Sequence, residues 1–201
     1  MKKLFIFILF FASIINSYCQ TAEEYWTSGS AKFNKKDYKG AIADFSKTIE
    51  LNPKHAGAYY NRGLSKKLIT DFEGALADYN KAIEINPKYS TAYNNRGYLK
   101  YVLKDNDGAI LDLNKSIELD AKNPEAYCNR ALIKNSNKDY EVAVADYTKA
   151  IEINPKYAEA YNNRGLTKLN LNQKESGCAD LNKAVELGYS KAKESIVKYC
   201  K

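Results

Sequence analysis

Histidine is almost missing from this chain, since His55 is the only one in 201 residues. The sequence also has no glycine-rich phosphate loop, no Gly-x-Ser-x-Gly and no His-Glu-x-x-His. Its cysteines form no Cys-x-x-Cys pair of the kind that binds zinc. Because catalysis and metal binding need such groups in convergent sets, we expect no enzyme activity, no metal site and no cofactor. The four cysteines are Cys19, Cys128, Cys178 and Cys200.

Proline and glycine are also scarce, with four and ten residues, so composition marks no linker inside the chain. One folded unit behind a short leader is therefore expected. The net charge of +7 comes from 31 Lys and Arg against 24 Asp and Glu. These charges are spread along the chain rather than gathered in a stripe, which argues against nucleic-acid binding.

The longest apolar run, Leu4 to Ile15, follows Met-Lys-Lys at the N-terminus. A basic start and an apolar run of this length are typical of a signal peptide, and the run is too short to span a bilayer. Ser17 and Cys19 are small residues suited to cleavage before Gln20. Residues 1–19 are therefore predicted to be the signal peptide of a periplasmic or secreted protein. Lipidation of Cys19 is the alternative, and no transmembrane span is expected in the mature chain.

A tyrosine recurs at i and i+34 all along the chain, and the segments around it stay in register. Small residues recur four places after it and again twelve places further on, where two helices can approach closely. Apolar residues at i, i+3, i+4 and i+7, as between Ala75 and Ile83, indicate amphipathic helices that Asn-Pro then ends. Each period is thus predicted to be a pair of antiparallel helices. The tyrosines are Tyr25, Tyr59, Tyr93, Tyr127 and Tyr161.

This period, with its small residues and terminal Asn-Pro, resembles the tetratricopeptide repeat (TPR) family. The resemblance implies an all-α, right-handed α-solenoid of five helix-turn-helix units and a C-terminal capping helix. It also implies that the first helices line a concave groove that receives a peptide or a partner segment. The expected repeats are 22–55, 56–89, 90–123, 124–157 and 158–189, and the capping helix is 190–201.

Asparagines recur two places after the tyrosine in every repeat but the first, which has Thr27, at a position that by the family's geometry faces the groove. A carboxamide both donates and accepts, so such a ladder can hold a peptide backbone; a merely solvated helix surface explains the same residues equally well. Neighbouring groove positions vary between repeats, as a specificity surface should. The ladder comprises Asn61, Asn95, Asn129 and Asn163, and the varying positions include Trp26, Tyr60, Leu64, Asn94, Tyr98 and Asn162.

These features predict a protein-interaction scaffold or adaptor of the cell envelope. Its partner is expected to be a protein or peptide whose identity the sequence does not give. The alternative is a structural, self-associating module of an envelope assembly. A monomer or a weakly self-associating chain is expected in either case.

Arginine recurs at a position where the family usually carries an apolar residue, and a buried arginine must be paired. An aspartate precedes each of these arginines, and one lysine, with the constant spacing i to i+18. We therefore predict ion pairs between successive repeats, with pairing inside one repeat as the alternative. The predicted pairs are Asp44 with Arg62, Asp78 with Arg96, Asp112 with Arg130, Asp146 with Arg164 and Asp180 with Lys198.

A lysine set late in the first helices is expected to be a solvated face rather than a basic strip that binds an acidic partner. It comprises Lys32, Lys66, Lys100, Lys134 and Lys168.

A disulfide is predicted between Cys178 and Cys200. Cys178 takes a packing position in the last second helix, and Cys200 falls on the capping helix that covers it. The two Cα atoms are expected within the bridging range of about 4.4 to 6.8 Å, and export would supply an oxidising compartment. Two buried thiols are the alternative, and Cys128 is expected to stay a free thiol.

Overall fold

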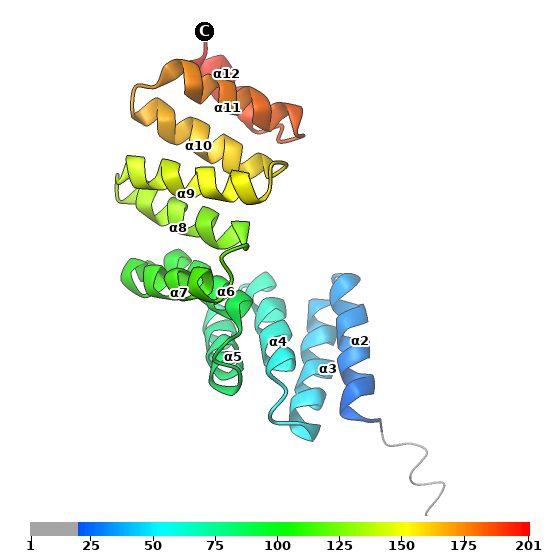
Figure 1. Ribbon diagram of the computed structural model, residues 1–201. Helices are drawn as coiled ribbons and strands as arrows, with labels where there is room; N and C mark the ends of the chain where they lie inside the picture. The colour runs from blue at the N-terminus through cyan, green and yellow to red at the C-terminus, as the bar shows by residue number, and fades with distance from the viewer. Residues whose placement is uncertain (1–19) are drawn as a thin grey trace, which may run out of the picture. The chain divides into compact units, whose positions relative to one another are not determined.

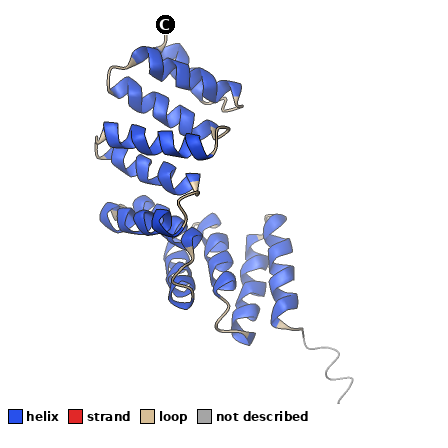
Figure 2. Ribbon diagram, in the orientation of Figure 1, coloured by secondary structure: helices blue, strands red, loops and turns tan. Residues whose placement is uncertain are grey.

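The computed structural model describes residues 20–201, so the predicted signal peptide lies outside the described residues. The described part contains eleven α-helices and no strand (Figures 1 and 2). None of these helices combines the length and the apolar character needed to cross a membrane. The helices are α2 (Ala22–Asn34), α3 (Tyr38–Leu51), α4 (Ala56–Leu68), α5 (Phe72–Ile85), α6 (Ser90–Val102), α7 (Asn106–Leu119), α8 (Pro124–Ser136), α9 (Tyr140–Ile153), α10 (Ala158–Asn170), α11 (Lys174–Glu186) and α12 (Ala192–Tyr199).

Consecutive helices pair into five hairpins, from α2 with α3 to α10 with α11, and α12 follows the last of them (Figure 1). The predicted all-α solenoid of helix pairs is thereby confirmed. Within each unit, hairpins pack on their neighbours in sequence, as α3 does on α4 and α7 on α8. This is the rule for repeat folds.

Local sequence explains where these helices begin. Thr21 and Glu24 form a capping box, in which the Thr21 side chain accepts from the Glu24 N–H at 3.2 Å. Pro124 opens α8, where a missing N–H costs little. Three second helices begin after an aspartate whose carboxylate accepts an N–H three residues later. These aspartates are Asp37, Asp71 and Asp105.

Glycine is required where the last hairpin is tightest. A Cβ atom on Gly165 would lie 2.8 Å from the carbonyl oxygen of Gly177, and one on Gly177 would lie 2.9 Å from that of Gly165. Both contacts are with backbone, which cannot swing away. The small residues that the repeat pattern placed here therefore let α10 and α11 approach closely.

The chain divides into two compact units, the first ending at Asn86 and the second beginning at Pro87. Because a hairpin buries its apolar face only against its neighbours, no shared core prevents such a division. The first unit buries Phe45 and Tyr79 completely, and the second does the same with Leu113, Tyr147 and Leu181.

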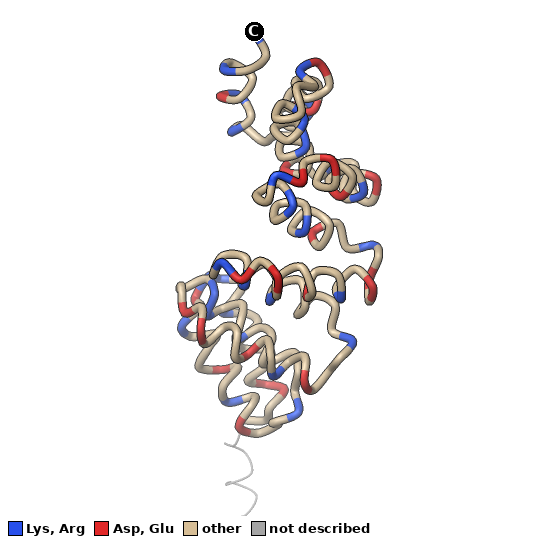
Figure 3. The backbone as a smooth tube through the Cα atoms, turned by 90° about the vertical axis from the view of Figure 1, so that its left-hand side faces the viewer, with Lys and Arg blue, Asp and Glu red and all other residues tan. Residues whose placement is uncertain are grey.

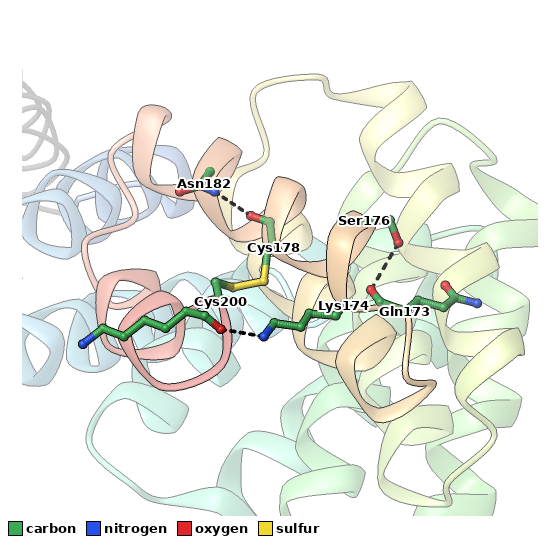
Figure 4. The surroundings of a disulfide bond; sticks show 7 residues. Gln173, Lys174, Ser176, Cys178, Asn182 and Cys200 are labelled. Atoms are coloured by element: carbon green, nitrogen blue, oxygen red, sulfur yellow. Dashed lines mark hydrogen bonds between the residues drawn. A yellow bond between two sulfur atoms is a disulfide. The ribbon is translucent and has the colours of Figure 1, made fainter.

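The second unit ends in a cross-linked cap. Ala192 of α12 is fully buried against Leu181 and Ala184 of α11. Cys178 and Cys200 form a disulfide with their Cα atoms 5.7 Å apart, which confirms the predicted pair (Figure 4). The last helix is therefore held both by apolar packing and by a covalent bond.

Candidate peptide-binding surface

The first helices form the inner layer of the second unit. Helix α6 contacts α8, α8 contacts α10, and α10 contacts α12, whereas no comparable contact joins α7 to α9 or α9 to α11 in this described unit. Helices that touch their counterparts lie on the inner side of a curved stack. The exposed side chains of α6, α8 and α10 thus share one concave face, as the family resemblance implied.

Asn94 and Asn162 do not lie on that face, contrary to the prediction that they line the groove. They are only 3% and 7% exposed. The Nδ2 of Asn129 donates to the Oδ1 of Asn94 at 2.9 Å, which links α8 to α6, and the Nδ2 of Asn162 donates to the Oδ1 of Asn163 at 3.0 Å. The physical reason is that this repeat position packs between consecutive first helices, where Cys128 is also buried.

The ladder asparagines remain half-buried at the surface of the first helices. Asn95 donates to the backbone oxygen of Thr91 in its own helix at 3.0 Å. Asn129 and Asn163 each make one bond to a buried asparagine. Since a carboxamide offers two N–H groups and an acceptor oxygen, those two side chains keep capacity for a further partner. Three residues further along the same helices lie the half-buried side chains of Tyr98, Leu132 and Leu166.

In the first unit, the predicted groove aromatics pack against neighbouring rings. The ring of Trp26 lies 4.6 Å from that of His55 and 5.4 Å from that of Phe45, measured between centroids. The Tyr60 ring lies 6.0 Å from the Tyr79 ring. Both aromatics are partly exposed, as are Asn61 and Leu64 of α4. These residues form a second surface that belongs to the first unit alone.

The ion pairs run within each hairpin, so the predicted pairing between repeats is wrong. In the second hairpin, Arg62 donates from Nε and Nη2 to the two oxygens of Asp78 at 2.9 and 2.6 Å. The tight turn between antiparallel helices places positions i and i+16 opposite each other. The other hairpins repeat this geometry in Arg96 with Asp112, Arg130 with Asp146 and Arg164 with Asp180. The unsupported pairs are Asp44–Arg62, Asp78–Arg96, Asp112–Arg130, Asp146–Arg164 and Asp180–Lys198.

A lysine completes most of these clusters. Lys66 Nζ lies 2.8 Å from Asp78, and Lys168 Nζ lies 2.7 Å from Asp180. In the first hairpin, Asp44 accepts from Ser28 at 2.6 Å and pairs with Lys32 at 2.7 Å. Two further members of the set are Lys100, which pairs with Asp112 at 2.9 Å, and Lys134, which turns to Asp139 at 3.5 Å. The set is thus tied into the hairpins rather than presented as a strip. Figure 3 shows both signs of charge interspersed along the backbone of each unit.

Arg62, Arg130 and Arg164 also contact the preceding hairpin, through a small polar side chain of its second helix. They lie over the signature tyrosine of their own hairpin as well, as Arg62 does over Tyr59 at 5.5 Å. Each of these three guanidinium groups is therefore held on three sides. The bonds to the preceding helix run from Arg62 to Ser46 at 3.1 Å, from Arg130 to Asn114 at 2.7 Å and from Arg164 to Thr148 at 3.1 Å.

The remaining reactive groups have structural roles. The Nδ1 of His55 caps α4 by accepting the Ala58 N–H at 3.0 Å. Burial raises the pKa of the Cys128 thiol to about 12, which suppresses the nucleophilic thiolate at neutral pH. The described residues contain no cluster of three or more His, Cys, Asp or Glu that could hold a metal ion.

Family models agree with this architecture. A TPR repeat model matches residues 29–67, 71–104 and 132–172, and a tetratricopeptide repeat model matches 90–123 and 158–187. The chain belongs to the tetratricopeptide repeat family. Members of this family are in general non-catalytic protein-interaction modules. No curated protein sequence matches the chain.

Several solved TPR structures are similar in fold. MamA is 24% identical, with a TM-score of 0.70 over 86% of this chain and 94% of that one. YrrB, described as a TPR protein with an unusual peptide-binding site, is 20% identical, with a TM-score of 0.68 over 92% and 96%. PilW, described as a type IV pilus biogenesis factor, is 18% identical, with a TM-score of 0.75 over 88% and 79%. At these identities the likeness concerns the fold.

Proposed function

We propose that this TPR protein is an adaptor that binds an extended segment of a partner protein on the first helices of its second unit. The observation that carries the proposal is the inner layer formed by α6, α8 and α10. Recurring carboxamides share this layer with the half-buried aromatic and aliphatic side chains of Tyr98, Leu132 and Leu166. YrrB, which has a similar fold, is described as having a peptide-binding site, and this supports the proposal that the present chain binds a peptide segment.

The two kinds of residue would have different tasks. Asn129 and Asn163 would hydrogen-bond the partner's backbone, which is the same in every peptide. Tyr98, Leu132 and Leu166 would contact its side chains and so decide which segments bind. An aromatic anchor usually contributes more to affinity than the contacts around it.

Site-specific photo-crosslinking tests this proposal. Replacing Tyr98 by the photoreactive residue benzoylphenylalanine keeps an aromatic ring on α6, and we expect it to crosslink a partner in the native envelope. The matched control carries the same residue at Leu111 of α7, which is 70% exposed on a second helix and should capture far less. Crosslinks from Leu111 alone would contradict the proposal, and crosslinks only between copies of the chain would favour the self-associating module.

We also infer that the protein is exported, with residues 1–19 as its signal peptide. The basic start and apolar run support this, and so does the Cys178–Cys200 disulfide, which persists in an oxidising compartment. The intact mass of protein purified from its host provides the test. Cleavage predicts a chain that begins at Gln20, and lipidation predicts an acylated Cys19. An uncleaved N-terminus together with reduced Cys178 and Cys200 would contradict export.

A further inference from the structure

Three buried side chains adjoin the asparagine ladder of the second unit. Asn94, Cys128 and Asn162 occupy the same repeat position on α6, α8 and α10 and are only 3%, 1% and 7% exposed. In each of these helices the next residue is a ladder asparagine. A buried carboxamide destabilises a fold unless it is hydrogen-bonded, so its bonding partners indicate what the residue does.

Asn94 holds the ladder asparagine of the next hairpin. The Nδ2 of Asn129 donates to the Oδ1 of Asn94 at 2.9 Å, from α8 to α6. Because burial leaves the Asn94 side chain little freedom to turn, this bond fixes the plane of the half-buried Asn129 carboxamide. The oxygen and the second N–H of that carboxamide form no other hydrogen bond within residues 20–201. The buried residue therefore determines which groups of Asn129 stay available.

Asn163 is held in a corresponding way by two buried neighbours. Its Oδ1 accepts from the Nδ2 of Asn162 at 3.0 Å. Whereas burial raises the pKa of the Cys128 thiol, hydrogen bonding with Tyr157 and Asn163 lowers it, so the thiol of α8 adjoins the Asn163 amide of α10. The two ladder residues are thus fixed with different groups engaged, an N–H of Asn129 and the oxygen of Asn163.

We propose that Asn94 is a positioning residue of the partner-binding surface. It does not touch the partner; it holds the Asn129 carboxamide in the orientation that meets the partner's backbone. Cys128 and Asn162 do the same for Asn163. A carboxamide that is already ordered loses less conformational entropy when it binds, so this arrangement strengthens binding without adding a contact. The inference rests on the proposed function and names the residues that act through the ladder.

The alternative role for Asn94 is to join α6 and α8, with no effect on what binds. A second cross-helix bond in this layer has only that role: the Oγ1 of Thr167 donates to the Oδ1 of Asn135 at 3.0 Å, from α10 to α8. Thr167 is also buried, and this bond includes no ladder side chain. Thr167→Val removes the bond and keeps the shape of the side chain, so this variant is the matched control.

The binding test uses the Tyr98 photo-crosslinking protein in the native envelope. Asn94→Leu removes the acceptor and leaves an apolar side chain in the buried position. We expect the crosslinked fraction of the partner to fall roughly threefold to tenfold, the change for one lost hydrogen bond. In an Asn129→Ala background, Asn94→Leu should cause no further loss, because Asn94 acts only through Asn129. Thr167→Val should leave the crosslinked fraction unchanged.

A second measurement needs no partner. In the ¹⁵N-labelled full chain, relaxation of the side-chain nitrogen of Asn129 should show a carboxamide as rigid as the helix backbone, because Asn94 holds it. In Asn94→Leu the same group should become mobile. Circular dichroism checks that the variant is folded, and Asn94→Ala, with a smaller side chain, replaces it if leucine unfolds the chain.

A mobile Asn129 side chain together with a smaller crosslinked fraction supports the inference. An Asn129 side chain that stays rigid in Asn94→Leu overturns it, and so does an unchanged crosslinked fraction, an additive loss in the double variant or an equal loss in Thr167→Val. If the Tyr98 protein crosslinks no partner at all, the adaptor function itself fails, and the relaxation measurement still reports separately whether Asn94 positions Asn129.

Discussion

Replacing Asp180 by Asn should lower the free energy of unfolding of the second unit by about 3 to 5 kcal/mol. Asp180 is 6% exposed and faces both Arg164 and Lys168, whose side chains are 14% and 16% exposed. The variant leaves two largely buried cations without their carboxylate. Inside the hairpin, water does not reach these cations well enough to replace the lost ion pairs. Urea denaturation followed by circular dichroism measures the change.

Two controls separate this effect from a simple loss of charge. Glu186→Gln lies on the same helix but removes an exposed i,i+3 partner of Lys183, so it should cost less than about 0.5 kcal/mol. The loss of unfolding free energy in Asp146→Asn should lie between those of the other two variants. Among the described residues Asp146 forms an ion pair with Arg130 but not with Lys134, which pairs with Asp139 instead. If Asp180→Asn were no more destabilising than Glu186→Gln, the cluster would not stabilise the hairpin.

Removing the disulfide should destabilise the C-terminal end by about 3 kcal/mol. The bond joins cysteines 22 residues apart, and opening it restores the conformational freedom of that loop in the unfolded chain. Helix α12 has neighbours on one side only, so the loss should first appear there as faster amide hydrogen exchange in residues 192–199. The comparison is between the oxidised protein and a variant with Cys178→Ser and Cys200→Ser.

A reducing agent provides the control for this second prediction. It should destabilise the native protein but leave the double variant unchanged, since Cys128 is already a free thiol. Equal exchange rates in α12 with and without the bond would show that the packing of Ala192 alone holds the helix.

Much of the fold follows from the sequence because repetition presents the same signals several times. The tyrosine period, the small residues and Asn-Pro predicted helical hairpins, and the register predicted Cys178 opposite Cys200. The ion pairs show where this logic fails. Because the sequence repeats, an aspartate at position i, such as Asp78, has one arginine at i+18 in the next hairpin and another at i−16 in its own. Spacing fits both partners equally, and only the turn geometry selects the second.

The candidate site was harder to predict for a related reason. Periodicity shows that Asn94 and Asn95 occupy two neighbouring positions on α6. It does not show which of the two the first helix of the following hairpin, α8, covers. Asn94 is buried beneath Asn129. Asn170 of α10 and Tyr199 of α12 line one pocket, although they belong to different elements and share no repeat register. Tertiary packing brings them together, and no local pattern signals it.

The contacts of the arginines bear on how a repeat protein of this kind can gain or lose whole hairpins. The buried aspartates pair inside their own hairpins, and Arg62, Arg130 and Arg164 reach the hairpin before theirs through a hydrogen bond to an uncharged side chain, as Arg164 does to Thr148. Duplicating or deleting one whole hairpin therefore strands no buried charge at the new junction. Had the ion pairs crossed between hairpins, each duplication or deletion of a hairpin would have to restore the matching partner on both sides of the new junction. Ser28, which donates to Asp44 in the first hairpin, shows that even the guanidinium is dispensable there.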